Sequence, residues 1–144
     1  DFRKKKTKKD IEYLISLTGP EPQRAMLEKK LLSQIDDLEG DIVVTLGKTK
    51  KISIKTKQNI TIYPIVTKEK REELLSRAKM VISRSGYSTI MDLAITGTKA
   101  LMTPTPGQIE QEYLAEYHNE KGTFYSVNQD NVNLKKDLEI AKKL

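Results

Sequence analysis

The sequence predicts an α/β fold, a Rossmann-like domain built on a doubly wound parallel sheet. Short apolar runs rich in Val, Ile and Leu alternate along the chain with segments whose apolar residues recur at helical spacing. Glycine and proline residues punctuate this alternation. Strands that alternate with helices of about 10–15 residues form βαβ units with right-handed crossovers, and therefore a parallel sheet.

The first half of the chain is expected to hold three strands and a helix. Residues 11–17 form a mostly apolar, β-branched run that ends at a Thr-Gly-Pro turn, which predicts a buried strand. Residues 41–46 predict a second buried strand, and residues 59–63 alternate as a strand before a proline. The Lys-rich stretch between them could hold a short hairpin arm carrying two isoleucines. Residues 21–38 predict a helix, because apolar residues recur at helical spacing at Met26, Leu27, Leu31 and Ile35.

The second half repeats the alternation. A polar turn over residues 83–86 leads into a helix that Gly97 is expected to cap, and a Pro-Thr-Pro-Gly cluster over residues 104–107 breaks the chain after the next strand. The expected order is a helix over residues 68–78, a strand over 80–82, a helix to about residue 95, a strand over 99–103, a helix over 108–121, a strand near 123–127 and a helix over 130–144.

The composition indicates one ordinary domain, with residues 1–10 as a basic tail or linker and residues 11–144 as the folded part. The 144 residues are 37% hydrophobic and 32% charged, a balance typical of globular proteins. Because there is no Cys and one His, we exclude disulfides and thiolate or His-rich metal sites and expect no metal or cofactor. No apolar run approaches the roughly 20 residues of a membrane span. The sequence begins without Met, so we expect a fragment or a processed chain.

The net charge of +6 is concentrated in two segments. Residues 1–10 carry a net +4 and residues 47–57 a net +5, which leaves −3 on the rest of the chain. Neither basic segment has the interleaved aromatic residues that single-strand binding uses. We therefore expect solvated lysines and no nucleic acid partner; a steep salt dependence of oligonucleotide affinity would indicate otherwise. Contact with acidic lipid headgroups or an acidic partner stays open.

Three loops are candidates for binding, because ligands of such sheets lie beyond the carboxyl ends of the strands. They cover residues 18–24, 83–89 and 104–111. The second loop puts hydroxyl residues and a glycine at a strand-to-helix junction, which suits a phosphate at the helix N-terminus; an ordinary helix cap is the alternative. The first loop is weaker, because it lacks a G-x-G-x-x-G fingerprint and Glu21 would repel a phosphate.

Polar residues beyond these loops extend the candidate site. Asp92 lies one turn after Thr89, where its carboxylate could accept hydrogen bonds from a ribose, or could instead complement the helix dipole. Gln108, Gln111 and Glu112 share a helical face and could bind sugar hydroxyls, or could form a solvated face. No nucleophile paired with a base can be argued, and His118 is expected at an exposed or edge position.

Residues 81–122 resemble the C-terminal domain of glycosyltransferase family 28. The resemblance is carried by S-R-x-G-x-x-T at residues 83–89, an acid three residues later, a small-residue helix ending in Gly, and P-x-P-G followed by Gln. The segments LTGPEPQR and IYPIV are similar to a Gly-rich turn and a uracil-side loop of the family. The family's Gly-Gly-Ser type turn is here Gly19-Pro20-Glu21-Pro22, and its frequent second Gln is here Glu112.

The resemblance implies one half of a GT-B type glycosyltransferase, namely the half that holds the nucleotide-sugar donor. It places Ser85, Gly86, Ser88 and Thr89 at the pyrophosphate, Asp92 at the ribose, Gln111 at the sugar and Ile65 beside the uracil. The full set of donor-binding residues that we expect is Gly19, Ile65, Arg84, Ser85, Gly86, Ser88, Thr89, Asp92, Gln108, Gln111 and Glu112.

The implied activity is transfer of a sugar from a UDP-sugar to an acceptor hydroxyl, with a lipid-linked acceptor. The family's catalytic base belongs to the N-terminal half, so the resemblance implies no catalytic residue in this chain and no activity without an acceptor-binding domain or partner chain. The expected location is the cytoplasm, with peripheral contact at the membrane face. The alternatives are the donor-binding subunit of a split transferase and a nucleotide-sugar epimerase or hydrolase of the same architecture.

Overall fold

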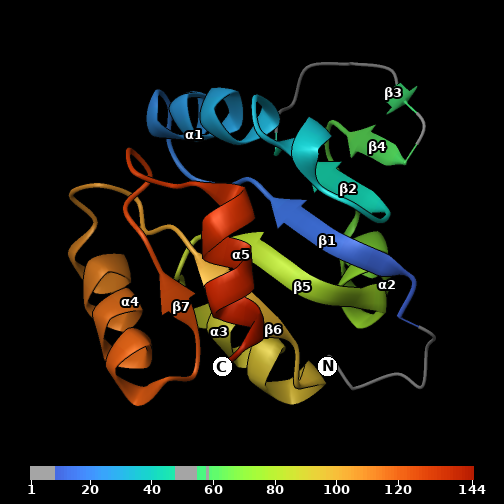
Figure 1. The fold of residues 1–144 in the computed structure, drawn as a ribbon. Coiled ribbons are helices and arrows are strands. Elements are labelled where there is room, and N and C mark those ends of the chain that lie inside the picture. The colour runs from blue at the N-terminus through green and yellow to red at the C-terminus, as the bar shows by residue number, and fades with distance from the viewer. Residues whose placement is uncertain (1–8, 48–54, 58) are drawn as a thin grey trace.

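A central sheet separates two layers of helices in the computed structural model, which describes residues 9–47, 55–57 and 59–144 (Figure 1). The strands lie in the order β3-β4-β2-β1-β5-β6-β7. Their bounds are β1 (Ile11–Ser16), β2 (Ile42–Thr45), β3 (Lys55–Lys57), β4 (Ile60–Tyr63), β5 (Ala78–Ser83), β6 (Lys99–Met102) and β7 (Tyr125–Ser126). Neighbouring strands from β4 to β7 pair in parallel, whereas the edge strand β3 pairs antiparallel with β4. The predicted doubly wound parallel sheet is confirmed.

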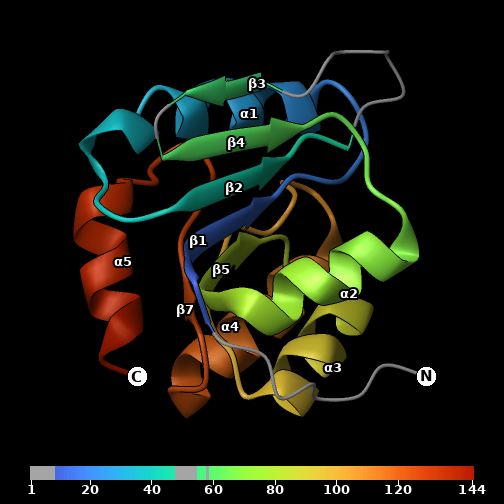
Figure 2. The same ribbon diagram turned by 90° about the vertical axis from the view of Figure 1, so that its right-hand side faces the viewer.

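Each face of the sheet carries its own apolar core, because successive strand residues point to opposite faces. On one face Ile15 and Val44 pack with residues of α1 (Gln23–Leu32), a 3₁₀ turn over Ile35–Asp37 and α5 (Leu134–Lys142). On the other face Leu14 and Val81 pack with α2 (Lys68–Arg77), α3 (Tyr87–Thr96) and α4 (Ile109–Lys121). Figure 2 shows α5 on one side of the strands and α2 and α3 on the other.

The order of the strands reverses between β1 and β5. From β1 the chain continues to β2 on one side, whereas β5 pairs with β1 on the other side and leads to β6. The pairing of Ile15 with Ile82 brings the carboxyl ends of β1 and β5 side by side. The loops after these two strands therefore meet at the topological switch point, where open α/β sheets bind ligands.

The predicted helix over residues 21–38 is shorter in the structure. It ends at Leu32 and is followed by the 3₁₀ turn. The hydroxyl of Ser33 and the side-chain amide of Gln34 both donate to the Lys30 carbonyl, and Gln34 also donates to the Val132 carbonyl. The first two bonds satisfy the Lys30 carbonyl near the end of the helix, and the third ties Gln34 to the segment before α5.

The final helix also differs, beginning at Leu134 and not at residue 130. Asn133 caps it by accepting from the Lys136 amide, while Asp137 accepts from the Asn133 amide, a reciprocal arrangement that fixes the start of a helix. Strand β5 begins at Ala78, directly after α2, and so is longer than predicted. Gly97 caps α3 in the left-handed conformation, as predicted. The isoleucines of the expected hairpin arm, Ile52 and Ile54, and residues 1–8 of the basic tail lie outside the described residues.

Candidate functional site

Arg84 fastens the three candidate loops to one another at the carboxyl edge of the sheet. Its side chain is buried, with 3% of the residue exposed. It donates to the carbonyls of Thr103 at 3.0 Å, Pro104 at 3.3 Å, Gln23 at 3.3 Å and Thr18 at 3.4 Å. Burial lowers the pKa of Arg84 to about 10, so the guanidinium stays charged at neutral pH. The charged guanidinium is therefore buried under the candidate loops, and its N–H groups donate to backbone oxygens.

The second loop presents the N-terminus of α3 to solvent. Gly86 is the N-cap, with φ −75° and ψ 150°, and within the described part of the chain no side chain caps the first turn of the helix. The space around Gly86 is open, because a Cβ placed there would meet nothing within 4 Å. Ser88 is exposed and Thr89 is half-buried. Uncapped amides at the positive end of a helix are suited to binding an anion.

Ser85 is fully buried, and its hydroxyl donates to the Gln111 carbonyl at 2.7 Å. This bond joins the second loop to α4. The Ser85 side chain is therefore turned into the protein, and what this residue can offer a ligand is its backbone.

The first loop contacts the third through Gly19. A Cβ at Gly19 would lie 3.5 Å from the Thr105 hydroxyl and 3.8 Å from Nε of Arg84. The Glu21 carboxylate, which we expected to repel a phosphate, pairs with Nε of Arg24 at 2.7 Å and accepts from the Ala25 amide at 3.0 Å. Glu21 thus caps α1 and is balanced by a cation, which reduces its repulsion of an anion at this edge.

The third loop is held by the helix that follows it. Oε1 of Gln111 accepts from the Thr105 amide at 2.8 Å, and Oε2 of Glu112 accepts from the Gly107 amide at 3.3 Å. Gln108 is exposed. Glu112 also lines a groove of about 490 Å³ that runs between α4 and the segment after β7. The groove has both polar and apolar lining residues, namely Pro104, Glu112, Ala115, Glu116, Asn119, Ser126, Val127, Asn128 and Asn131.

Asp92 forms an ion pair across the interface of α2 and α3. Its Oδ2 lies 2.9 Å from Nη1 of Arg71, and the side chains of both residues are partly exposed. Arg71 and Thr89 also line a cavity of about 10 Å³ at the carboxyl ends of β1 and β2, a volume close to that of one water molecule. Ile65, expected beside a uracil, is 60% exposed in the loop that leads into α2.

Two residues at this edge were missed by the sequence interpretation. Arg71 lies three and four residues before Leu74 and Leu75, on the inward side of α2, and a cation at such a position indicates a buried or bridging partner. Thr105 has a buried hydroxyl that finds no partner among the described residues. Its place within a Pro-rich turn gave no sign of this.

His118 lies in the last turn of α4, at the end of the helix away from the third loop. Its ring packs 5.1 Å from Tyr117 and 5.4 Å from Phe124, and burial lowers the pKa of the imidazole. The described residues contain no group of three or more potential metal ligands. Within the same residues, no helix is long and apolar enough to cross a bilayer.

A doubly wound parallel sheet with the three candidate loops at its switch point defines a Rossmann-like domain. The chain belongs to glycosyltransferase family 28: the model of the Glycosyltransferase family 28 C-terminal domain matches residues 3–142.

Curated relatives match shorter segments of the chain. The UDP-N-acetylglucosamine--N-acetylmuramyl-(pentapeptide) pyrophosphoryl-undecaprenol N-acetylglucosamine transferase of Trichormus variabilis is 41% identical over 58 residues, which is 39% of this chain and 16% of that enzyme. The enzyme of the same name from a Methylobacterium species is 39% identical over 41 residues, covering 28% of this chain and 11% of the relative. The matched segments are thus a small part of these enzymes.

Solved glycosyltransferases share the fold. The glycotransferase of kitacinnamycin superposes with a TM-score of 0.71 at 14% identity, over 96% of this chain and 37% of the other. MurG from Acinetobacter baumannii gives a TM-score of 0.65 at 18% identity, over 96% of this chain and 42% of the other. At these identities the likeness concerns the fold alone. The chain spans about two fifths of each solved enzyme.

Proposed function

We propose that this domain binds the nucleotide-sugar donor, a UDP-sugar, for transfer of the sugar to an acceptor hydroxyl. The observation that carries the proposal is the uncapped N-terminus of α3, which lies at the switch point beside the loops that Arg84 joins. A diphosphate placed there would accept from backbone amides and interact with the positive end of the helix dipole, without needing a metal ion.

The diphosphate would contact the amides that follow Gly86 and the hydroxyls of Ser88 and Thr89. Ser85 would contribute its backbone, because its hydroxyl is bonded to Gln111. Gly19 would offer its backbone to the diphosphate, and a larger residue there would project toward Thr105 and Arg84. Arg84 would act indirectly, by holding the loops and adding a buried positive charge.

The other parts of the donor would lie on either side of the diphosphate. Asp92 would bind the ribose, and Ile65, in the loop before α2, would lie beside the uracil. Gln108, Gln111 and Glu112 would face the sugar, at the mouth of the groove beside α4. The names of the curated relatives, which include UDP-N-acetylglucosamine, support this class of donor.

The acceptor and the catalytic base would come from an N-terminal half or from a partner chain. The leading candidate for the acceptor is a lipid-linked sugar, as the pyrophosphoryl-undecaprenol in the relatives' names suggests. A domain that binds only the donor cannot position an acceptor hydroxyl. We therefore propose that the chain alone binds the donor and transfers no sugar.

Calorimetric titration of the chain with UDP, a UDP-sugar and NAD tests the proposal. We expect UDP and the UDP-sugar to bind more tightly than NAD, because the dinucleotide fingerprint is missing. Ser88→Asp should weaken UDP binding by about tenfold or more, because it places a carboxylate at the anion site. It should leave stability unchanged or slightly raised, since an acid suits the first turn of a helix.

Ala94→Asp, on the exposed side of the same helix, is the matched control and should leave UDP affinity unchanged. Incubation of the chain with a labelled UDP-sugar and lipid acceptors should give no labelled product. NAD binding as tight as UDP binding would contradict the proposal that the domain binds a UDP-sugar. Sugar transfer by the chain alone would contradict the proposal that the acceptor and the catalytic base come from another domain or chain.

A further inference from the structure

The ion pair between Arg71 and Asp92 joins two elements that flank the proposed nucleotide site. Asp92 lies on α3, one turn after the residues proposed for the diphosphate. Arg71 lies on the first turn of α2, directly after the loop that carries Ile65. The Thr67 hydroxyl caps that turn by accepting from the Lys70 amide at 3.1 Å, so the base of the Arg71 side chain is fixed in place.

The pairing leaves one carboxylate oxygen for a ligand. Arg71 donates to Oδ2 at 2.9 Å, and no hydrogen bond reaches Oδ1 from the described residues. With 21% of its side chain exposed, Asp92 is accessible to a ligand without being freely rotating in solvent. An ionised carboxylate accepts several hydrogen bonds at once, so it can keep Arg71 and still accept from a sugar hydroxyl.

We propose that Arg71 is a positioning residue that aims Asp92 at the ribose hydroxyls. The inference rests on the proposed function and adds a residue to which no role in the site had been given. The aspartate side chain is short, so the Asp92 carboxylate must be held close to its ligand. Arg71 holds the carboxylate from the α2 side, and its charge offsets the negative charge that Asp92 brings near a diphosphate.

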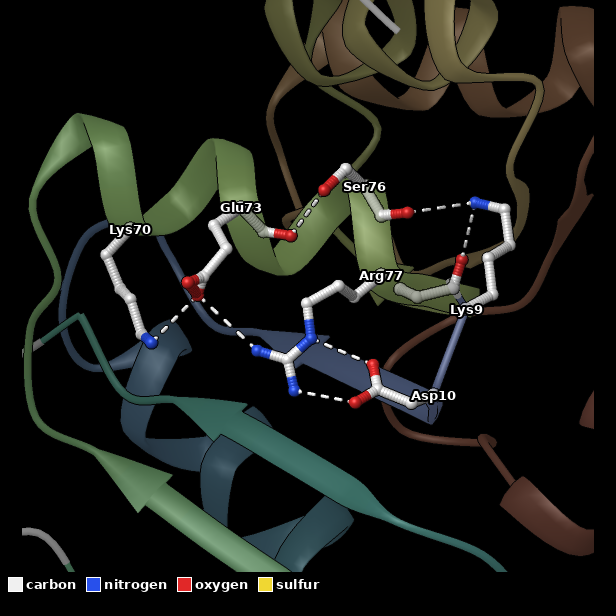
Figure 3. Close-up of polar contacts among 7 residues, drawn as sticks. Lys9, Asp10, Lys70, Glu73, Ser76 and Arg77 are labelled. Carbon is white, nitrogen blue, oxygen red and sulfur yellow. Dashed lines mark hydrogen bonds and ion pairs between the residues drawn. The ribbon is translucent and has the colours of Figure 1, made fainter. Parts of the chain in front are cut away.

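A second arginine of the same helix provides a matched control. Arg77 donates to both carboxylate oxygens of Asp10, at 2.8 and 3.0 Å, and lies 3.4 Å from Glu73 (Figure 3). Lys9 strengthens this junction by donating to the Ala78 carbonyl at 3.1 Å. The Arg77 network ties the start of β1 to the end of α2, at the edge of the sheet opposite the proposed site. It should therefore affect stability without affecting nucleotide binding.

The test compares UDP with 2′-deoxy-UDP by calorimetry on the folded chain. Wild type should prefer UDP by roughly 10–100-fold if Asp92 makes a charge-assisted bond to the ribose. Arg71→Met should lower this preference several-fold, mainly by weakening UDP, and Arg71→Lys should restore part of it. Arg77→Met should keep the wild-type preference. Thermal unfolding of each variant checks that it is folded.

The outcomes separate the inference from the function on which it rests. If wild type binds UDP and Arg71→Met retains the full preference for the ribonucleotide, Arg71 is an ordinary bridging residue and the inference is overturned. An equal loss of affinity for UDP and 2′-deoxy-UDP in Arg71→Met would also overturn the inference, because that pattern indicates a general charge effect. If wild type does not bind UDP, the proposed function fails and the inference fails with it.

Discussion

Arg84 lies in a motif that predicted ligand binding, and its side chain joins the three candidate loops to one another. The spacing S-R-x-G-x-x-T predicted a strand-to-helix loop at the carboxyl edge of the sheet, but it did not give the direction of each side chain. The polar groups of Arg84 and Ser85 are directed to carbonyls of neighbouring loops. These partners lie between 19 and 66 residues away in the sequence, so local spacing could not have predicted them.

Arg84→Lys should destabilise the domain by roughly 1–3 kcal/mol, because an ammonium cannot span the carbonyls that the planar guanidinium bridges and buried acceptors are left unpaired. Urea unfolding measures the change. Arg77→Lys is the control, and should cost about 0–1 kcal/mol because its ion pairs are partly exposed. Equal losses for the two variants would show that Arg84 does not hold the loops together.

The ion-pair partners of two carboxylates at the candidate site, those of Asp92 and Glu21, were not predicted from the sequence. Asp92 was identified as accessible and close to the second loop, but its Arg71 partner was not, since the two residues belong to different helices. Glu21 was expected to face the site, whereas it caps α1 and pairs with Arg24. In both cases a partner cation changes what the carboxylate does. The ligand roles of all these residues stay predictions.

At the scale of elements, periodicity predicted the order of helices and strands, and side-chain bonds determined where they end. The helix predicted over residues 21–38 is interrupted where the side chains of Ser33 and Gln34 both donate to the Lys30 carbonyl of α1. The last helix begins late because Asn133 and Asp137 form its cap. Apolar periodicity is insensitive to such bonds, so it locates the body of a helix better than its ends.

Close packing of adjacent strand ends makes Gly47 a sensitive position. It follows β2 with φ +67°, and a Cβ there would lie 2.4 Å from the backbone oxygen of Leu17, just after β1. Gly47→Ala should therefore destabilise the domain by about 1–2 kcal/mol for the left-handed backbone and by about 1–3 kcal/mol more for the clash.

Gly122→Ala is the matched control for this prediction. Gly122 has φ +72°, and a Cβ there would meet no described atom within 4 Å. Its substitution should therefore show only the cost of the left-handed backbone. Chemical denaturation of the two variants gives the difference. A loss at Gly47 no larger than that at Gly122 would mean that the loop after β2 can move away from β1.

At the scale of the whole molecule, the alternation of strands and helices was sufficient to predict a doubly wound sheet and, with it, the edge at which the candidate loops lie. The right-handed crossover rule leaves few arrangements for such a chain, and the observed order β4-β2-β1-β5-β6-β7 places all three candidate loops at that edge. A short hairpin arm was expected in the Lys-rich stretch, and β3 in that stretch pairs antiparallel with β4; its bounds were not predicted, because the strand is short and Lys-rich. The groove beside α4 was also not predicted, since it forms between segments that periodicity treats separately.

We propose that a UDP-sugar binds at the carboxyl edge of the sheet, around the N-terminus of α3. Backbone amide chemical shifts recorded during titration with UDP test this most directly. We predict that the largest changes fall in residues 18–24, 86–89 and 104–111, with little change at Asp10, Asp41 or Ala78 on the opposite edge. Largest changes at that opposite edge, or no saturable change at any amide, would contradict the claim.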